Sequence, residues 1–116
     1  MALADLSVET VEQVVVARVD GEIDMSNASE LGNTISRQVS NEAAALVLEL
    51  SDVGYVDSAG IQVIYQLHER LQTRGQQLWL VVPAGSPIAY PLRLADIPGA
   101  IAVAETLDGA LESLGA

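Results

Sequence analysis

Cysteine and lysine are both absent from this 116-residue chain, and its five basic residues are outnumbered by sixteen acidic ones. Without cysteine there are no disulfides, thiol nucleophiles or zinc–thiolate sites. Without lysine there is no P-loop lysine and no Schiff-base chemistry. The net charge of −11 argues against binding to nucleic acids or to anionic lipid surfaces, because both need clustered basic residues.

Long apolar runs are also missing. The longest, residues 43–48, is far shorter than the ~18 residues of a membrane-spanning helix. The first five residues show neither the basic nor the apolar region of a secretory signal. Half of the chain is nevertheless hydrophobic, which is enough for a core, and its length is typical of one domain. We therefore expect residues 1–116 to form a single cytoplasmic domain with no membrane insertion.

Hydrophobic periodicity predicts the elements of the fold. Apolar runs with β-branched residues indicate strands, which we place at residues 6–11, from 14 to an end marked by Gly21 and Asp24, and at 43–50, 78–82 and 100–104. Spacings of three and four indicate helices, which we place at residues 25–39, 58–74, 92–95 and from 107 onward. Turns are expected at 12–13, at the start of 51–57 and at 98–99. The order β-β-α-β-α-β-α-β-α implies an α/β fold, a mixed sheet of about five strands with about four α-helices.

Residue types at the helix ends predict how each helix begins or stops. For helix 25–39, Met25 opens the apolar face, and either Asp24 or Ser26 is the expected N-cap. Gly75 suits the C′ position after helix 58–74. Thr106 is the expected N-cap of the last helix.

One stretch is a candidate site: residues 56–61, Val-Asp-Ser-Ala-Gly-Ile. It places the Asp57 carboxylate and the Ser58 hydroxyl where an extended segment becomes a helix. The small residues Ala59 and Gly60 are expected to leave the first helical turn open to approach. The unpaired N–H groups and the positive dipole of such a turn favour an anion. The simpler alternative is that Ser58 is the N-cap and nothing more.

A second carboxylate, Asp24, also lies between a strand and a helix. If the two preceding strands are neighbours, Asp24 and Asp57 converge at one edge of the sheet near Ser58. Paired carboxylates of this kind can hold a metal–phosphate group, such as that of a nucleotide, or accept a hydroxyl proton. The alternative is that each carboxylate caps its own helix.

Helix 58–74 divides into distinct faces. The stripe expected to face the core consists of Gly60, Val63, Ile64, Leu67 and Leu71. Ile61, Tyr65 and His68 stack at the edge of that stripe, where they either widen it or form a docking surface. The charged residues of this helix nearly cancel, in contrast to the rest of the acidic chain.

The sequence offers no arrangement of catalytic residues. The single histidine, His68, lies ten residues after Ser58, a rise of about 15 Å along a helix, which is too far for a serine–histidine pair. The motifs G-x-S-x-G, G-x-G-x-x-G and H-E-x-x-H are absent. We therefore expect a protein that is not an enzyme, with no catalytic residues, no metal and no cofactor.

Asp-Ser-Ala-Gly-Ile at 57–61, after the apolar strand 43–50, together with Gly-Glu-Ile-Asp at 21–24 and the order of elements, resembles STAS domains. The similarity is greatest to the single-domain bacterial anti-sigma factor antagonists and spans essentially the whole chain. It implies that Ser58 is phosphorylated by a partner that is both an anti-sigma factor and a serine protein kinase. In this family the unphosphorylated antagonist binds that partner and frees a sigma factor, and a metal-dependent serine phosphatase resets it.

The resemblance also implies where the partner binds. It assigns the neighbourhood of the phosphorylation site to Asp24, Asp57, Ala59 and Gly60, and the partner-binding surface to Ile61, Gln62 and Tyr65. Ala59 stands where many antagonists carry a second Ser or Thr, and Asp-Ser-Ala-Gly also occurs in other STAS branches. The alternative is therefore a non-enzymatic STAS subunit of a lipid-trafficking ABC-type transport complex, in which the same helix docks on an ATPase.

Overall fold

The computed structural model describes residues 4–116, in which five strands form one mixed sheet in chain order. The strands are β1 (Ala4–Val11), β2 (Val14–Ile23), β3 (Ala45–Val56), β4 (Gln77–Val81) and β5 (Ala102–Ala104). β1 and β2 pair antiparallel, and every later pair is parallel. The α/β fold and the mixed sheet of five strands are as predicted.

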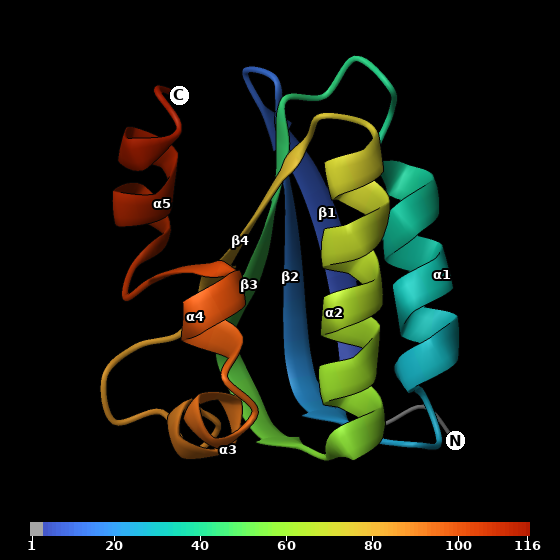
Figure 1. Cartoon of the computed structure of the whole chain (residues 1–116), viewed down its shortest axis with the longest axis vertical. Coiled ribbons are helices and arrows are strands. Elements are labelled where there is room, and N and C mark those ends of the chain that lie inside the picture. Colours follow the sequence, from blue (N-terminus) through green and yellow to red (C-terminus); the bar gives the residue numbers. More distant parts are fainter. Residues whose placement is uncertain (1–3) are drawn as a thin grey trace.

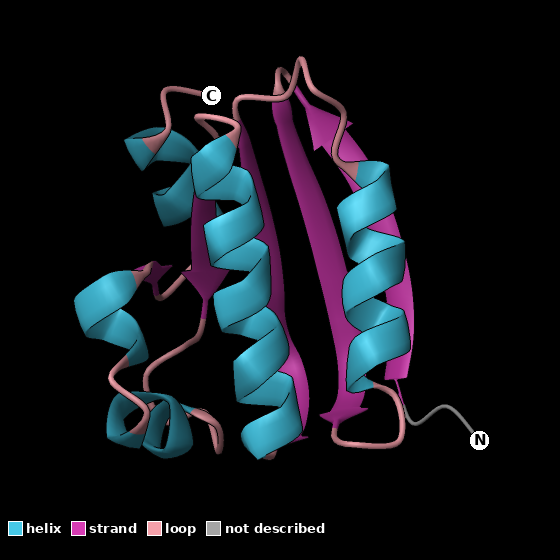
Figure 2. Ribbon diagram, turned by 45° about the vertical axis from the view of Figure 1, so that its right-hand side comes forward, coloured by secondary structure: helices cyan, strands magenta, loops and turns pink. Residues whose placement is uncertain are grey.

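Helices cover both faces of this sheet. Figures 1 and 2 show α1 (Ala28–Gln38) and α2 (Ser58–Thr73) side by side on one face. The short helices α3 (Ala89–Leu94) and α4 (Ile97–Ala100) connect β4 to β5, and α5 (Leu107–Ser113) packs on the opposite face. Successive residues of β2 accordingly alternate between two cores, with Val15 and Ala17 facing α1 and α2 while Val14 and Val16 face the α5 side.

The centre of β3 is the most buried part of the sheet. Ala45, Leu46 and Val47 have no exposed surface, and Leu48 is almost as deeply buried. This strand is covered on both faces, because Leu46 and Leu48 pack in the core beneath α1 and α2, whereas Ala45 and Val47 pack in the core on the α5 side.

The prediction of a turn within residues 51–57 is wrong, because β3 continues without interruption to Val56. Beyond Glu49 it pairs only with β2, so its polar residues are tolerated at an open edge. The β2–β3 pairing shifts register twice, and each shift inserts one extra residue into β3. At the second shift Val53 and Tyr55 pair with the adjacent β2 residues Gly21 and Glu22, so Gly54 between them has no partner in β2. β2 ends at Ile23, directly before Asp24, as predicted.

The predicted start of the first helix is also wrong. α1 begins at Ala28, and Met25 lies in the preceding turn with 84% of its surface exposed. The N-cap position is taken by Asn27, not by Asp24 or Ser26. The rest of the predicted apolar face is confirmed, since Ala28 and Ile35 are buried in the core.

Other helix ends agree with the sequence in part. Gly75 has φ +72° and its N–H donates to the Gln72 carbonyl, so the predicted C′ glycine is confirmed. The Thr106 hydroxyl accepts the N–H of Gly109, as expected of an N-cap. The prediction of four helices misses α4, a short helix at the position where residues 98–99 were expected to form a turn. Pro98 lies in the first turn of α4, where a proline is compatible with a helix. α3 also begins earlier than predicted, at Ala89.

Candidate functional site

Asp57 is the N-cap of α2 and its carboxylate makes two contacts. Oδ1 accepts the N–H of Gly60 at 3.1 Å, and Oδ2 accepts the N–H of Met25 at 3.0 Å, in the β2–α1 loop. The Asp57 carbonyl accepts the N–H of Ile61, the first bond within the helix. One carboxylate therefore caps the helix and holds the neighbouring loop against its start.

Ser58 is the first residue of α2 and its side chain is exposed. The alternative in which Ser58 caps the helix is wrong, because Asp57 performs that role. The Ser58 hydroxyl instead lies just inside the helix, where the helix dipole is positive. An anion attached to this hydroxyl would meet a favourable potential from the helix itself.

Gly60 serves packing more than access. A Cβ atom at this position would lie 2.6 Å from Val56 Cγ2 and 3.1 Å from the Ile23 carbonyl oxygen. The expectation that Gly60 opens the helical turn to approach is therefore wrong, since it is buried against the ends of β2 and β3. Ala59 is half-buried and packs against the edge of the core.

The Asp24 carboxylate organises the β2–α1 loop. Its Oδ1 accepts hydrogen bonds from the Ser26 hydroxyl and, at 2.9 Å, from the Ser26 N–H. The Ser26 hydroxyl and then its N–H stabilise the ionised form, so they lower the pKa of Asp24 below its ordinary value. The Asp24 carbonyl accepts the N–H of Ala28 at 2.8 Å, which connects the loop to α1.

Asn27 is a site-forming residue that the sequence reasoning missed. Its Oδ1 accepts the Asp24 N–H at 3.0 Å, and its Nδ2 donates to the Glu22 carbonyl at 2.8 Å. Only 7% of its surface is exposed, so these bonds are largely shielded from water. An asparagine directly before an apolar helical repeat was the available signal, because Asn is a leading N-cap and loop residue.

The predicted convergence of Asp24 and Asp57 has a structural basis in the sheet. Ile23 and Val56, the residues before them, are partners in the parallel β2–β3 ladder. Each carboxylate is engaged by local donors, Asp24 by Ser26 and Asp57 by Gly60 and Met25. Within residues 4–116, no group of three or more acidic or histidine side chains is placed to hold a metal ion.

The residues of α2 predicted to face the core are largely those that the structure buries. Gly60, Ile64, Leu67 and Leu71 are buried, and Val63 is half-buried against α1, where its Cγ1 leaves no room for a Cβ at Gly32. The three residues assigned to partner binding differ in exposure. Gln62 is exposed, Ile61 is half-buried at the core edge, and Tyr65 is half-buried with its hydroxyl donating to the Ala95 carbonyl at 2.7 Å.

Comparison of the sequence and structure with known proteins identifies the family of this chain. The model of the STAS domain matches residues 5–110. Anti-sigma-F factor antagonist RsfB of Mycobacterium tuberculosis is 31% identical over 99 residues, covering 84% of this chain and 79% of RsfB. A crystal structure of an anti-sigma factor antagonist from Mycobacterium paratuberculosis has a TM-score of 0.86 at 28% identity, covering 97% of this chain and 95% of that one.

A more distant structure shares the fold alone. The Bacillus cell fate determinant SpoIIAA in its phosphorylated form has a TM-score of 0.70 at 17% identity, with 95% of this chain and 99% of that one covered. The chain belongs to the STAS domain family.

None of the helices among the described residues is long and apolar enough to cross a membrane.

Proposed function

We propose that this chain is an anti-sigma factor antagonist that acts by binding and not by catalysis. In this proposal it binds an anti-sigma factor that is also a serine protein kinase, and the binding frees a sigma factor. Phosphorylation of Ser58 ends the binding, and a metal-dependent serine phosphatase restores it. The observation that carries the proposal is the exposed Ser58 side chain on the first residue of α2, in a chain 31% identical to a protein named as an anti-sigma-F factor antagonist.

The physics of the helix start supports a switch at this residue. A phosphoryl group adds about −1.5 to −2 charge at neutral pH, and the positive end of the α2 dipole tolerates it without refolding. In a closed interface the same group adds bulk, loses hydration and meets the neighbouring Asp57 carboxylate. An unfavourable change of about 3 kcal/mol would weaken partner affinity more than a hundredfold.

The geometry also fits a protein that is a kinase substrate and not an enzyme. Both carboxylates near Ser58 are bound to donors of the chain itself, Asp57 to Gly60 and Met25, and Asp24 to Ser26. The only histidine, His68, lies further along the same helix, in its last turns. The site therefore presents a hydroxyl to a partner without a base of its own to activate it.

Titration calorimetry tests the proposal with purified ATP-binding anti-sigma factor kinases of the source organism as probes. Ser58→Ala is expected to bind one of these kinases with wild-type affinity, and Ser58→Glu at least about tenfold more weakly. Ser29→Glu, at an exposed serine of α1, is the matched control and should bind like wild type. Equal affinities for Ser58→Ala and Ser58→Glu would contradict the switch. In a pull-down from native lysate, recovery of an ABC-type ATPase in place of a small ATP-binding kinase would favour a transport-complex subunit.

A further inference from the structure

The strand β5 has one open side. In the sheet formed by residues 4–116 it is the last strand, and it pairs with β4. Successive residues of a strand direct their N–H and carbonyl groups to opposite sides, and the Ala104 carbonyl accepts the Val82 N–H on the β4 side. The N–H and carbonyl of Val103 therefore point outward, where a further strand could pair with them.

A cavity of about 320 Å³ adjoins this edge. It lies at the carboxyl ends of β4 and β5, and most of its lining is apolar, including Val82, Leu92, Pro98 and Val103. One wall is the β4–α3 connection, which Figure 1 shows curving outward on the side of the molecule away from α1. Val103 belongs both to the edge and to the cavity, so a segment paired with β5 would have the cavity next to its side chains.

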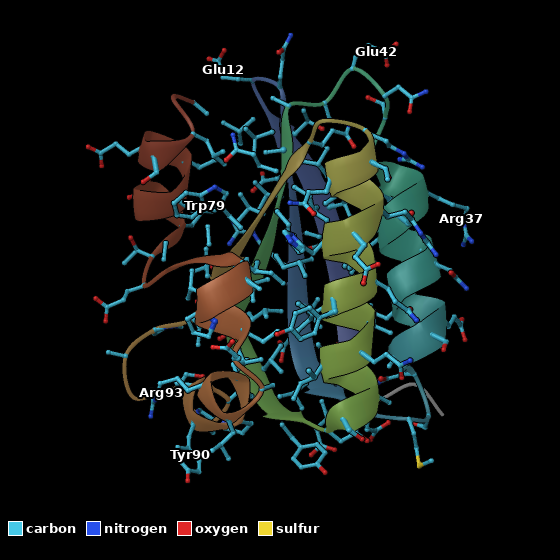
Figure 3. The ribbon with its side chains drawn as sticks, in the orientation of Figure 1. Glu12, Arg37, Glu42, Trp79, Tyr90 and Arg93 are labelled. Carbon is cyan, nitrogen blue, oxygen red and sulfur yellow. The ribbon has the colours of Figure 1, made fainter. Side chains whose placement is uncertain are left out.

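Two charged residues of opposite sign line the cavity, Arg93 on α3 and Glu105 after β5. Both are exposed, and the ion pairs found in residues 4–116 are made by Arg18, so neither charge is paired there. The Arg93 guanidinium carbon lies 5.8 Å from the centre of the Tyr90 ring, and Figure 3 shows both residues at the α3 corner of the molecule. Asp96, which is exposed after α3, is not part of the lining. The charge that faces the cavity from α3 is therefore positive.

The edge and the cavity together fit an extended peptide segment better than a second copy of this chain. A second copy paired through its own β5 would bring only two alanines and a valine to this position, which are too small to fill the cavity. A three-residue strand is also short for a dimer interface, which buries about 800 Å² on each partner. A peptide that adds a strand to a sheet edge gains affinity from backbone hydrogen bonds and specificity from pockets for its side chains.

We propose that the β5 edge and its cavity bind an extended peptide segment of a partner protein. The segment pairs with the Val103 backbone, places a large apolar side chain in the cavity, and carries an acidic and a basic residue that face Arg93 and Glu105. Alternate residues of an extended segment share a face, so the charged residues are expected two positions before and two positions after the apolar one. The lining includes no residue of α2, so this binding is distinct from that of the proposed function.

NMR titration of the isotope-labelled chain tests the proposal with defined probes. The probes are the blocked heptapeptide Thr-Asp-Thr-Phe-Thr-Lys-Thr and its reverse, Thr-Lys-Thr-Phe-Thr-Asp-Thr, which cover both directions of pairing. One of them is expected to shift the amide signals of Arg93, Val103 and Glu105 and to slow hydrogen exchange of the Val103 N–H. Replacing phenylalanine by serine in that peptide should weaken binding about tenfold or more, because the apolar side chain that fills the cavity is lost.

Two variants of the chain test the two parts of the site. Val103→Pro removes the outward N–H, and because proline is tolerated on an edge strand, it should keep the fold and bind the peptide about fivefold more weakly. Arg93→Glu should also weaken binding, and it should favour the peptide in which lysine replaces aspartate. Arg74→Glu is the matched control with the same net charge, at an exposed arginine after α2, and should bind like wild type. Urea unfolding of each variant checks that the fold is retained.

Each outcome is decisive. Amide shifts centred on Val103, with weaker binding in Val103→Pro and Arg93→Glu but not in Arg74→Glu, support the proposal. No binding of either peptide at millimolar concentration, or wild-type affinity in Val103→Pro or Arg93→Glu, overturns it. A wild-type chain that is dimeric by light scattering, and monomeric as Val103→Pro, would make a second copy the occupant and overturn it as well. Ser58→Glu should bind the peptide like wild type, so failure of this proposal leaves the proposed function standing.

Discussion

The Asp57 carboxylate joins two segments that are 32 residues apart, because its Oδ2 accepts the Met25 N–H while its Oδ1 caps α2 at Gly60. The start of α2 and the β2–α1 loop are thus held by a single side chain. This explains how an exposed loop keeps a defined position beside Ser58. It also makes Asp57 a positioning residue for the whole candidate site.

Replacing Asp57 by Ala should cost more stability than losing an ordinary helix cap. The variant loses both hydrogen bonds of the carboxylate, so we expect it to lower the free energy of unfolding by about 1–3 kcal/mol. Thr106→Ala, which removes a cap with a single bond to Gly109, should cost about 1 kcal/mol. Urea unfolding measures both, and hydrogen exchange should show faster exchange of the Met25 amide in Asp57→Ala alone. An unchanged Met25 amide would contradict the account.

Gly60→Ala should destabilise the fold although alanine is the better helix former. The added Cβ would lie 2.6 Å from Val56 Cγ2, so overpacking outweighs the gain in helix propensity by about 1–2 kcal/mol. Gly54→Ala is the control, because nothing lies within 4 Å of its Cβ position, and we expect it to be neutral or slightly stabilising. Thermal unfolding compares the two, and a Gly60→Ala protein as stable as wild type would refute the packing role.

The order of elements was predictable because most of them carry a clear hydrophobic period and a recognisable end. Gly75 and Thr106 are examples in which one residue type, a C′ glycine or an N-cap threonine, predicts the end of a helix correctly. The continuous strand through residues 51–56 was not predictable, since its polar residues and Gly54 resemble a turn. Pairing with β2 decides its conformation, and a sequence does not display that tertiary contact.

Glu12→Asn should stabilise the β1–β2 hairpin. Glu12 has φ +57°, a left-handed conformation that strains most side chains and that asparagine adopts more readily. We expect a gain of about 0.5–1 kcal/mol in the free energy of unfolding. Gln13→Asn, at the other residue of the same turn, should give no such gain, and urea titration distinguishes them. A loss of stability in Glu12→Asn would show that the glutamate side chain has another role.

The pKa of Asp24 should depend on Ser26. Because the Ser26 hydroxyl and N–H lower the pKa of Asp24 in the folded chain, its ionised form stabilises the loop. That contribution is complete above the unfolded pKa and is lost as the pH falls through the folded pKa. Carboxyl NMR titration should therefore show a higher pKa of Asp24 in Ser26→Ala and no change in Ser29→Ala. An unchanged value in Ser26→Ala would mean that the hydroxyl does not stabilise the carboxylate.

The candidate site was only partly predictable, for a related reason. The sequence places Asp57 and Ser58 at a helix start, but it does not show which of them is the cap. It also does not show that Gly60 is needed for packing against Val56, or that Asn27 is buried. These roles depend on the distance between the ends of β2 and β3, which only the assembled sheet determines.

The central claim is that phosphorylation of Ser58 ends partner binding, and one experiment tests it most directly. The purified chain is incubated with ATP and the anti-sigma factor kinase that binds it, and the product is examined by mass spectrometry and then by calorimetry. The account predicts one phosphoryl group, located on Ser58, and a phosphorylated chain that binds the kinase at least about a hundredfold more weakly. Phosphate at another residue, or a chain phosphorylated on Ser58 that binds with undiminished affinity, would contradict it.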